Sequence, residues 1–197
     1  MSVAVVILAG GKSRRMGRDK LKMSLGGHTL LETAANRFSD EFEDVFLSVA
    51  DENKYPDIKA RRIVDILPGA GPLSGLHAAL TFASSCGAYN GVFLVAADLP
   101  FASTRAAKCI IELGRDREAC VIKLHDGNLE PLFGYYGISL LPRCCDAILS
   151  GEYRVSEILR SADTRFIDPR ELGEHWDEKM IININRPEDF DMALLNF

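Results

Sequence analysis

Two uninterrupted apolar runs restrict the fold of this chain more than any other feature. Val3–Ala9 has the sequence VAVVILA and Val92–Ala97 has the sequence VFLVAA, with no polar residue in either. A strand with one face in water alternates apolar and polar side chains, whereas a strand covered on both faces is apolar throughout. Strands of the second kind belong to parallel sheets with helices on both sides. The two runs therefore predict an α/β fold with a mostly parallel sheet.

Shorter apolar runs rich in Val, Ile and Phe alternate with longer segments that have the period of a helix. The predicted strands are Val3–Ala9, Val45–Ala50, Arg62–Val64, Val92–Ala97, Ala119–Lys123, Leu132–Tyr136, Thr164–Ile167 and Met180–Ile184. The predicted helices are Thr29–Phe38, Leu73–Ser85, Thr104–Gly114, Ser139–Leu149, Val155–Ser161 and Pro187–Leu195. Because strands and helices alternate, we expect one three-layer α/β domain over residues 1–197, with an antiparallel excursion around residues 119–136.

The composition narrows the class of partner and the compartment. A formal net charge of −5 disfavours nucleic acid as a partner. No segment approaches the ~20 consecutive apolar residues of a membrane span. The first apolar run is short and lacks a basic segment in front of it, so we expect no signal peptide. The five cysteines are odd in number and lack C-x-x-C spacing, which argues against a disulfide framework and against a zinc site. We therefore expect a cytoplasmic protein with reduced cysteines and no membrane partner.

The predicted sheet also indicates where to look for a ligand. In open α/β sheets, ligands bind beyond the carboxyl ends of the parallel strands. We therefore expect functional residues just after Ala9, Ala50, Val64, Ala97 and Ile184.

The loop after the first strand combines glycines with cations. Gly10 and Gly11 follow the strand directly, and glycine allows a sharp turn and a close approach of a ligand to backbone N–H groups. The residues that follow are Lys12, Ser13, Arg14, Arg15, Gly17, Arg18 and Lys20. Such a loop suits a polyanion, most simply a triphosphate, although its spacing is neither that of a Walker A loop nor that of a dinucleotide loop. The alternative is a solvated basic turn.

Polar residues stand at the ends of three later strands. Asp98 ends the second apolar run, where it would either bind Mg²⁺ or form a turn before Pro100. Asp65 ends a short strand and would serve a ligand or cap a helix. Asn183 and Asn185 would lie on the same side of the last strand, where they would either close a turn or offer oxygens to a metal and its phosphates.

Five stretches, taken in order, resemble the molybdenum cofactor guanylyltransferase family. They are LAGGKSRRMGRDK (8–20), GPLSG (71–75), AADLP (96–100), EPLFGYY (130–136) and NINRPED (183–189). The first is specific for nucleotidyltransferases of this superfamily and the others narrow the choice. The resemblance runs from residue 3 to about 190. It implies a single Rossmann-like nucleotidyltransferase domain that transfers GMP from GTP to the molybdenum–molybdopterin cofactor with Mg²⁺ and releases pyrophosphate.

The resemblance also implies roles for individual residues. The nucleotide site would contain Leu8, Ala9, Gly10, Gly11, Ser48, Asp65 and Gly75, with Leu8, Ala9 and Gly10 along the guanine and ribose. Lys20 and Arg15 would contact the phosphates and hold the charge that develops on the leaving pyrophosphate. Asp98 would be the Mg²⁺ ligand, and Asn183 and Asn185 would serve the metal or the acceptor.

Two positions bear on the choice of base. Related cytidylyltransferases tend to carry L-A-A-G where this chain has LAGG (8–11), and they lack the GPLSG block, so Gly11 and the intact GPLSG favour guanine. Family members often have an asparagine where Ser48 stands, and a serine reaches less far. The alternatives are a cytidylyltransferase, another nucleotidyltransferase with a different phosphate acceptor, and a non-catalytic nucleotide-binding regulator. Besides GTP and molybdopterin, molybdoenzyme-maturation proteins are the candidate partners.

Overall fold

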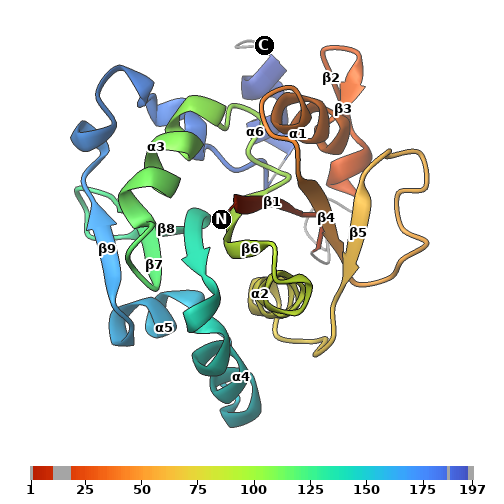
Figure 1. Ribbon diagram of the computed structural model, residues 1–197. Coiled ribbons are helices and arrows are strands. Elements are labelled where there is room, and N and C mark those ends of the chain that lie inside the picture. The colour runs from red at the N-terminus through yellow and green to blue at the C-terminus, as the bar shows by residue number, and fades with distance from the viewer. Residues whose placement is uncertain (1, 11–18, 186, 195–197) are drawn as a thin grey trace.

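A seven-stranded mixed sheet runs through the centre of the molecule (Figure 1). We describe a computed structural model over residues 2–10, 19–185 and 187–194. In sheet order, the strands are β5 (Arg61–Val64), β4 (Val45–Val49), β1 (Ser2–Leu8), β6 (Tyr89–Ala96), β8 (Leu129–Gly137), β7 (Ala119–Lys123) and β9 (Thr164–Ile167). All neighbouring strands are parallel except β8, which runs antiparallel to both β6 and β7. The predicted parallel sheet and its antiparallel excursion are confirmed.

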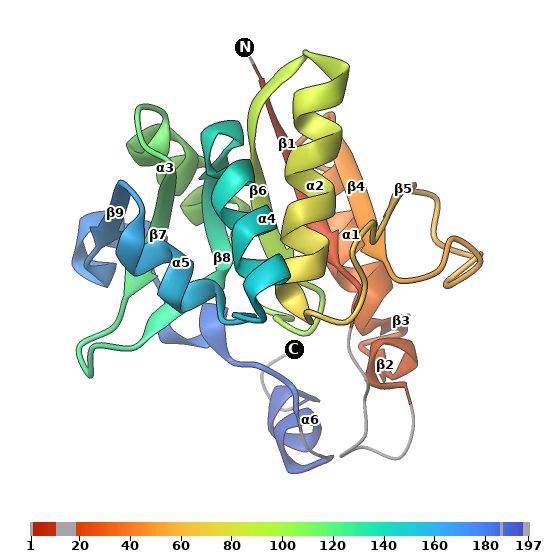
Figure 2. The same ribbon diagram turned by 90° about the horizontal axis from the view of Figure 1, so that it is seen from below.

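Helices cover both faces of the sheet, which makes the predicted three layers (Figure 2). The helices α1 (Leu30–Ser39) and α3 (Thr104–Gly114) pack on one face, and α2 (Pro72–Cys86), α4 (Leu141–Ser150) and α5 (Val155–Ser161) pack on the other. In β1, Val5 and Ile7 face the first pair of helices, while Val6 and Leu8 face the second group. All four side chains are buried, which explains why this strand is apolar at every position.

A short hairpin and the last helix form a third, smaller cluster. The hairpin strands β2 (Ser24–Leu25) and β3 (His28–Thr29) lead into α1, and Thr29 caps that helix in a capping box with Glu32. The helix α6 (Pro187–Leu194) packs here, since Leu25, Leu30, Ile184 and Ala193 share one buried cluster. This cluster holds the segment after residue 18 beside the segment that follows residue 183.

The prediction of a last strand over Met180–Ile184 is wrong. Two 3₁₀ helices, η3 (Pro169–His175) and η4 (Glu178–Ile181), stand in this region, and the residues after η4 are irregular. The Ile184 N–H donates to the Asp98 carbonyl at 3.1 Å, which joins the segment to the turn after β6. Because β1 and β8 already flank β6, the sheet offers no free edge beside Asp98. The apolar run instead buries Met180 and Ile184 and leaves Ile182 43% exposed.

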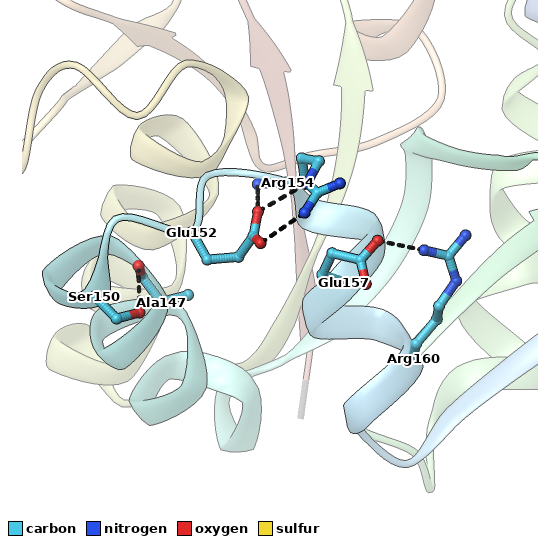
Figure 3. A network of polar contacts seen from close by, with 6 residues as sticks. All are labelled: Ala147, Ser150, Glu152, Arg154, Glu157 and Arg160. Atoms are coloured by element: carbon cyan, nitrogen blue, oxygen red, sulfur yellow. Dashed lines mark hydrogen bonds and ion pairs between the residues drawn. The ribbon is translucent and has the colours of Figure 1, made fainter.

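The connection between α4 and α5 is fixed by local contacts (Figure 3). The left-handed residue Gly151, with φ of 81°, ends α4. The Glu152 carboxylate then accepts three bonds from Arg154: from Nε and Nη2 at 3.0 Å each and from the backbone N–H at 2.9 Å. Arg160 pairs with Glu157 on the next turn. These exposed pairs define the start of α5, but water screens them and they add little to stability.

The five cysteines are free thiols in the structure, and their reduced state stays a prediction. Cys120 and Cys144 are buried, and burial raises the pKa of each thiol to about 12, which leaves them unreactive core residues. Within the described part of the chain, no helix is both long and apolar enough to cross a membrane.

Candidate active site

A cavity of about 650 Å³ opens where β1, β4 and β6 end. Its volume lies in the usual range for a small-molecule site, roughly 300–1,000 Å³. The residues that line it are Leu8, Gly10, Lys20, Leu21, Ser48, Val49, Ala50, Lys54, Asp65, Gly69, Gly71, Pro72, Gly75, Ala96, Asp98 and Leu132. The cavity therefore lies beyond the carboxyl ends of parallel strands, as the fold class predicts.

Most of the site residues named from the sequence lie on this cavity. Those that line it are Leu8, Gly10, Lys20, Ser48, Asp65, Gly75 and Asp98. Ala9 is buried beneath it, where its N–H donates to the Ser48 carbonyl at 2.9 Å. Gly11 and Arg15 lie outside the described residues.

Lys20 and Asp98 form the polar centre of the cavity. The Lys20 ammonium pairs with Asp98 Oδ2, and both side chains are only 17% exposed. It also donates to the Ile184 carbonyl at 2.9 Å and to Asn185 Oδ1 at 3.1 Å. The other carboxylate oxygen, Asp98 Oδ1, is buried and has no hydrogen-bond partner among the described residues. The structure thus joins residues that are 78 and 165 positions apart in the chain.

The two asparagines differ in position, contrary to the expectation that they share one side of a strand. Because no strand forms there, only Asn185 reaches Lys20. The Asn185 N–H donates to Asp189 Oδ2 at 2.9 Å, which ties this residue to the first turn of α6. Asn183 is half-buried and does not line the cavity.

Asp65 stands at the far side of the cavity, just after β5. Its N–H donates to the Val49 carbonyl at 3.0 Å, which extends the parallel ladder to this residue. Partial burial raises the pKa of the Asp65 carboxyl. The cavity therefore has one carboxylate balanced by a lysine and a second, separate one that is poorly solvated.

Gly75 allows α2 to approach the strands closely. A Cβ atom at this position would lie 2.5 Å from Leu8 Cδ2 and 2.7 Å from Ser48 Oγ, both nearer than real Cβ contacts. The loop before α2 also needs glycine, because Gly69 and Gly71 have φ of 104° and 61°. The Ser74 hydroxyl fastens this loop by donating to the Leu67 carbonyl and accepting from the Ala70 N–H. The GPLSG stretch thus forms one wall of the cavity.

The turn that presents Lys20 is anchored by residues that the sequence did not single out. Asp19 caps the 3₁₀ helix η1 (Lys20–Lys22) by accepting from the Leu21 N–H at 3.2 Å. The buried Tyr55 donates its hydroxyl to the other oxygen of Asp19 at 2.9 Å. An aspartate directly before the lysine is a helix-capping signal, but no pattern in the sequence connects it with Tyr55.

Arg62 holds the loop between β4 and β5 that carries Tyr55. Its guanidinium donates to the carbonyls of Lys54, Tyr55, Ile58 and Ala60 at 2.6–3.3 Å. Tyr55 has a positive φ of 54°, which is uncommon for a residue with a side chain. The Arg62 contacts stabilise this conformation and thereby place Lys54 on the cavity wall.

A register shift in the pairing of β8 with β7 lies at the EPLF stretch, which borders the cavity. Val121 pairs with Gly134 while the next residue, Ile122, pairs with Glu130. The Tyr136 hydroxyl donates to the Pro131 carbonyl across the register shift at 2.5 Å, and Leu132 lines the cavity. The Glu130 carboxylate accepts from the Leu132 N–H at 3.2 Å. Burial, together with the charge of Asp98, raises the pKa of Glu130.

Comparisons with solved structures first define the class. A structure of molybdopterin-guanine dinucleotide biosynthesis protein A from Archaeoglobus fulgidus superposes with a TM-score of 0.84 at 25% identity and covers 98% of each chain. A 2-C-methyl-D-erythritol 4-phosphate cytidylyltransferase from Thermus thermophilus shares the fold alone, at 17% identity with a TM-score of 0.69, covering 100% of this chain and 98% of the other. The fold therefore has the architecture of the nucleotidyltransferases.

The sequence defines the family within this class. A family profile described as "MobA-like NTP transferase domain" matches residues 5–166, and the chain belongs to that family. A probable molybdenum cofactor guanylyltransferase from Pelotomaculum thermopropionicum is 30% identical over 190 residues, which are 95% of this chain and 90% of the relative. One of the same name from Thermococcus kodakarensis is 31% identical over 189 residues, with 93% and 90% covered.

Proposed function

We propose that this protein transfers GMP from GTP to the molybdenum–molybdopterin cofactor, forming molybdopterin guanine dinucleotide and pyrophosphate. The family assignment and the names of the similar proteins support the reaction. The observation that carries the proposal is the Lys20–Asp98 pair, which is set in a cavity of nucleotide size at the carboxyl ends of the central strands. We further propose that residues 1–197 act as one domain in the cytoplasm.

The nucleoside would occupy the part of the cavity between β1, β5 and α2. Leu8 and Gly75 line an apolar wall, and Ser48 and Asp65 offer polar atoms at its edge. Ala9 and Gly11 complete the nucleotide site in this proposal. A carboxylate such as Asp65 can accept two hydrogen bonds from the N–H groups on one edge of guanine.

The phosphates would lie toward Lys20. Lys20 and Lys54 both line the cavity, and Arg15 is proposed to join them from the loop that precedes η1. Fixed cations at the place where charge develops stabilise the transition state of such a transfer. In the reaction, an oxygen of the acceptor phosphate forms a bond to the α-phosphorus, the bond from that phosphorus to the bridging oxygen breaks, and pyrophosphate leaves with the electron pair. The enzyme forms no covalent intermediate.

The residues near Asp98 fit a Mg²⁺ ion. Asp98 Oδ1 is buried and has no hydrogen-bond partner within the described ranges, so one carboxylate oxygen remains for a cation. No cluster of three or more His, Cys, Asp or Glu side chains suited to a metal occurs in the described part of the chain. A single available carboxylate suits Mg²⁺, which uses one or two carboxylates and completes its shell with water and substrate phosphates. When bound, Mg²⁺ supplies neutralisation of phosphate charge. Asn183 and Asn185 are proposed to serve this metal or the acceptor.

A pyrophosphate-release assay tests the proposal. GTP, CTP, UTP and ATP are each incubated with Mg²⁺, with and without molybdenum–molybdopterin. We expect pyrophosphate only when GTP and the acceptor are both present. Release with CTP would instead indicate a cytidylyltransferase, and GTP binding without release would indicate a nucleotide-binding regulator.

A further inference from the structure

Among the described residues, three oxygen atoms from two separate segments of the fold accept from the Lys20 ammonium. They are Asp98 Oδ2 after β6, the Ile184 carbonyl, and Asn185 Oδ1, the last two at 2.9 and 3.1 Å. The Ile184 N–H in turn donates to the Asp98 carbonyl at 3.1 Å, so the segment that supplies two of the oxygens is fixed against the residue that supplies the third. The oxygens therefore form one arrangement that does not depend on the lysine alone.

This arrangement has the chemistry of a cation site. A carboxylate, a backbone carbonyl and an amide oxygen are the ligands that hard divalent cations take in proteins. A lysine ammonium is a compact point charge with three N–H donors, and here it occupies the centre of such a set. The lysine thus balances the charge of Asp98 and uses the oxygens that a divalent cation would use.

The ammonium and a divalent cation cannot share these oxygens. Two positive charges a few ångströms apart in a poorly solvated site repel each other strongly, and both side chains of the pair are only 17% exposed. A divalent cation that takes these three oxygens must therefore displace the ammonium. Lys20 also lines the cavity, and its flexible stem allows the ammonium to move there.

We propose that Lys20 is the exchangeable counter-ion of Asp98: a divalent cation displaces its ammonium from the three oxygens, and the released ammonium meets the phosphates of the nucleotide. The exchange makes metal and nucleotide binding mutually favourable, since the nucleotide gives the displaced charge a new partner. This inference rests on the proposed metal site at Asp98, but it is independent of the identity of the base and of the acceptor.

Mn²⁺ binding without nucleotide, followed by electron paramagnetic resonance, tests the exchange. We expect Lys20→Met to bind Mn²⁺ at least about fivefold more tightly than the unmodified protein, because the competing charge is gone. Lys54→Met removes the same charge from the same cavity wall and should change the affinity by less than about twofold, since no contact joins Lys54 to Asp98 in the described structure. Adding Asp98→Asn to Lys20→Met should abolish the gain.

A second titration with GTP tests the coupling. GTP should increase the Mn²⁺ affinity of the unmodified protein by more than it increases that of Lys20→Met. If Lys20→Met does not fold, Lys20→Gln, which keeps an N–H donor without the charge, is measured with the same expectations.

Two results would overturn the exchange. If the unmodified protein binds Mn²⁺ through Asp98 but Lys20→Met binds it no more tightly, the exchange is wrong while the proposed function stands. If neither protein binds Mn²⁺, both the exchange and the proposed metal site fail.

Discussion

The hydroxyl of Tyr55 donates to Asp19 Oδ2 at 2.9 Å, and through this bond the β4–β5 loop fixes the turn that carries Lys20. Burial and the neighbouring Asp19 raise the pKa of Tyr55, so the hydroxyl keeps its proton and remains a donor. The lysine that lines the cavity is therefore positioned by a residue that does not line it.

Replacing Tyr55 by phenylalanine removes only this hydroxyl. We expect a loss of about 1.5 kcal/mol in the free energy of unfolding, as for a hydrogen bond to a charged group, and a rise in KM for GTP of up to about tenfold. Tyr89→Phe is the matched control, because Tyr89 is also a buried tyrosine whose pKa is raised by burial and by an aspartate, Asp44, but at the amino end of β6. It should lower stability without changing KM. Equal KM values for the two variants would contradict the positioning role of Tyr55.

Replacing Gly75 by alanine should destabilise the protein, although alanine normally favours a helix by about 1 kcal/mol over glycine. The added methyl would collide with Leu8 and Ser48 at the cavity wall. We expect a lower melting temperature and weaker GTP binding by calorimetry. Ser84→Ala on the exposed face of the same helix should leave both unchanged or slightly raise the melting temperature. A Gly75→Ala protein more stable than its parent would show that α2 shifts freely.

Replacing Glu130 by glutamine should make stability less dependent on pH. The pKa of Glu130 is raised in the folded state, so its contribution to stability is lost as the pH rises from the unfolded value of about 4.3 through the folded value. Glutamine cannot ionise and can still accept from Leu132. The variant should therefore be more stable than the parent in urea at about pH 7 and equal to it below about pH 4. The control is Glu174→Gln, at an exposed position, which should be as stable as the parent at both pH values. If Glu130→Gln and the parent differed in stability by the same amount at every pH, the raised pKa of Glu130 would not be the cause.

Replacing Arg62 by methionine should lower the free energy of unfolding, because the carbonyls of four loop residues lose a charged donor. We expect a loss of about 2–3 kcal/mol in urea denaturation. The adjacent Arg61 is 65% exposed and pairs with Asp44, so Arg61→Met should cost less than about 1 kcal/mol. Comparable losses for the two variants would mean that Arg62 does not hold the loop.

The buried strands and the cavity edge followed from the sequence because their signals are local. The apolar runs that became β1 and β6 are covered on both faces, and Asp65 and Asp98 lie within two residues of the ends of β5 and β6. The predicted helix boundaries lie within two residues of the observed ones, and those of Thr104–Gly114 are identical. Such features depend on side-chain periodicity and on the residues that end an element, which the sequence displays.

The remaining features depend on contacts between distant residues. Met180–Ile184 has the composition of a strand, but whether a strand forms depends on a free sheet edge, which β8 occupies. The contact of Tyr55 with Asp19 and the register shift in β8 likewise depend on how separate elements meet. No local pattern encodes these contacts, so the neighbours that position Lys20 and Glu130 emerged only from the structure.

Transfer of label from α-³²P GTP to molybdenum–molybdopterin tests most directly whether the Lys20–Asp98 cavity is the site of reaction. With the unmodified protein and Mg²⁺, the label should appear in molybdopterin guanine dinucleotide. Lys20→Ala and Asp98→Ala, each folded by circular dichroism, should form the product at a rate lower by about 10²–10³-fold. Label transfer by both variants at the parent rate would contradict this assignment.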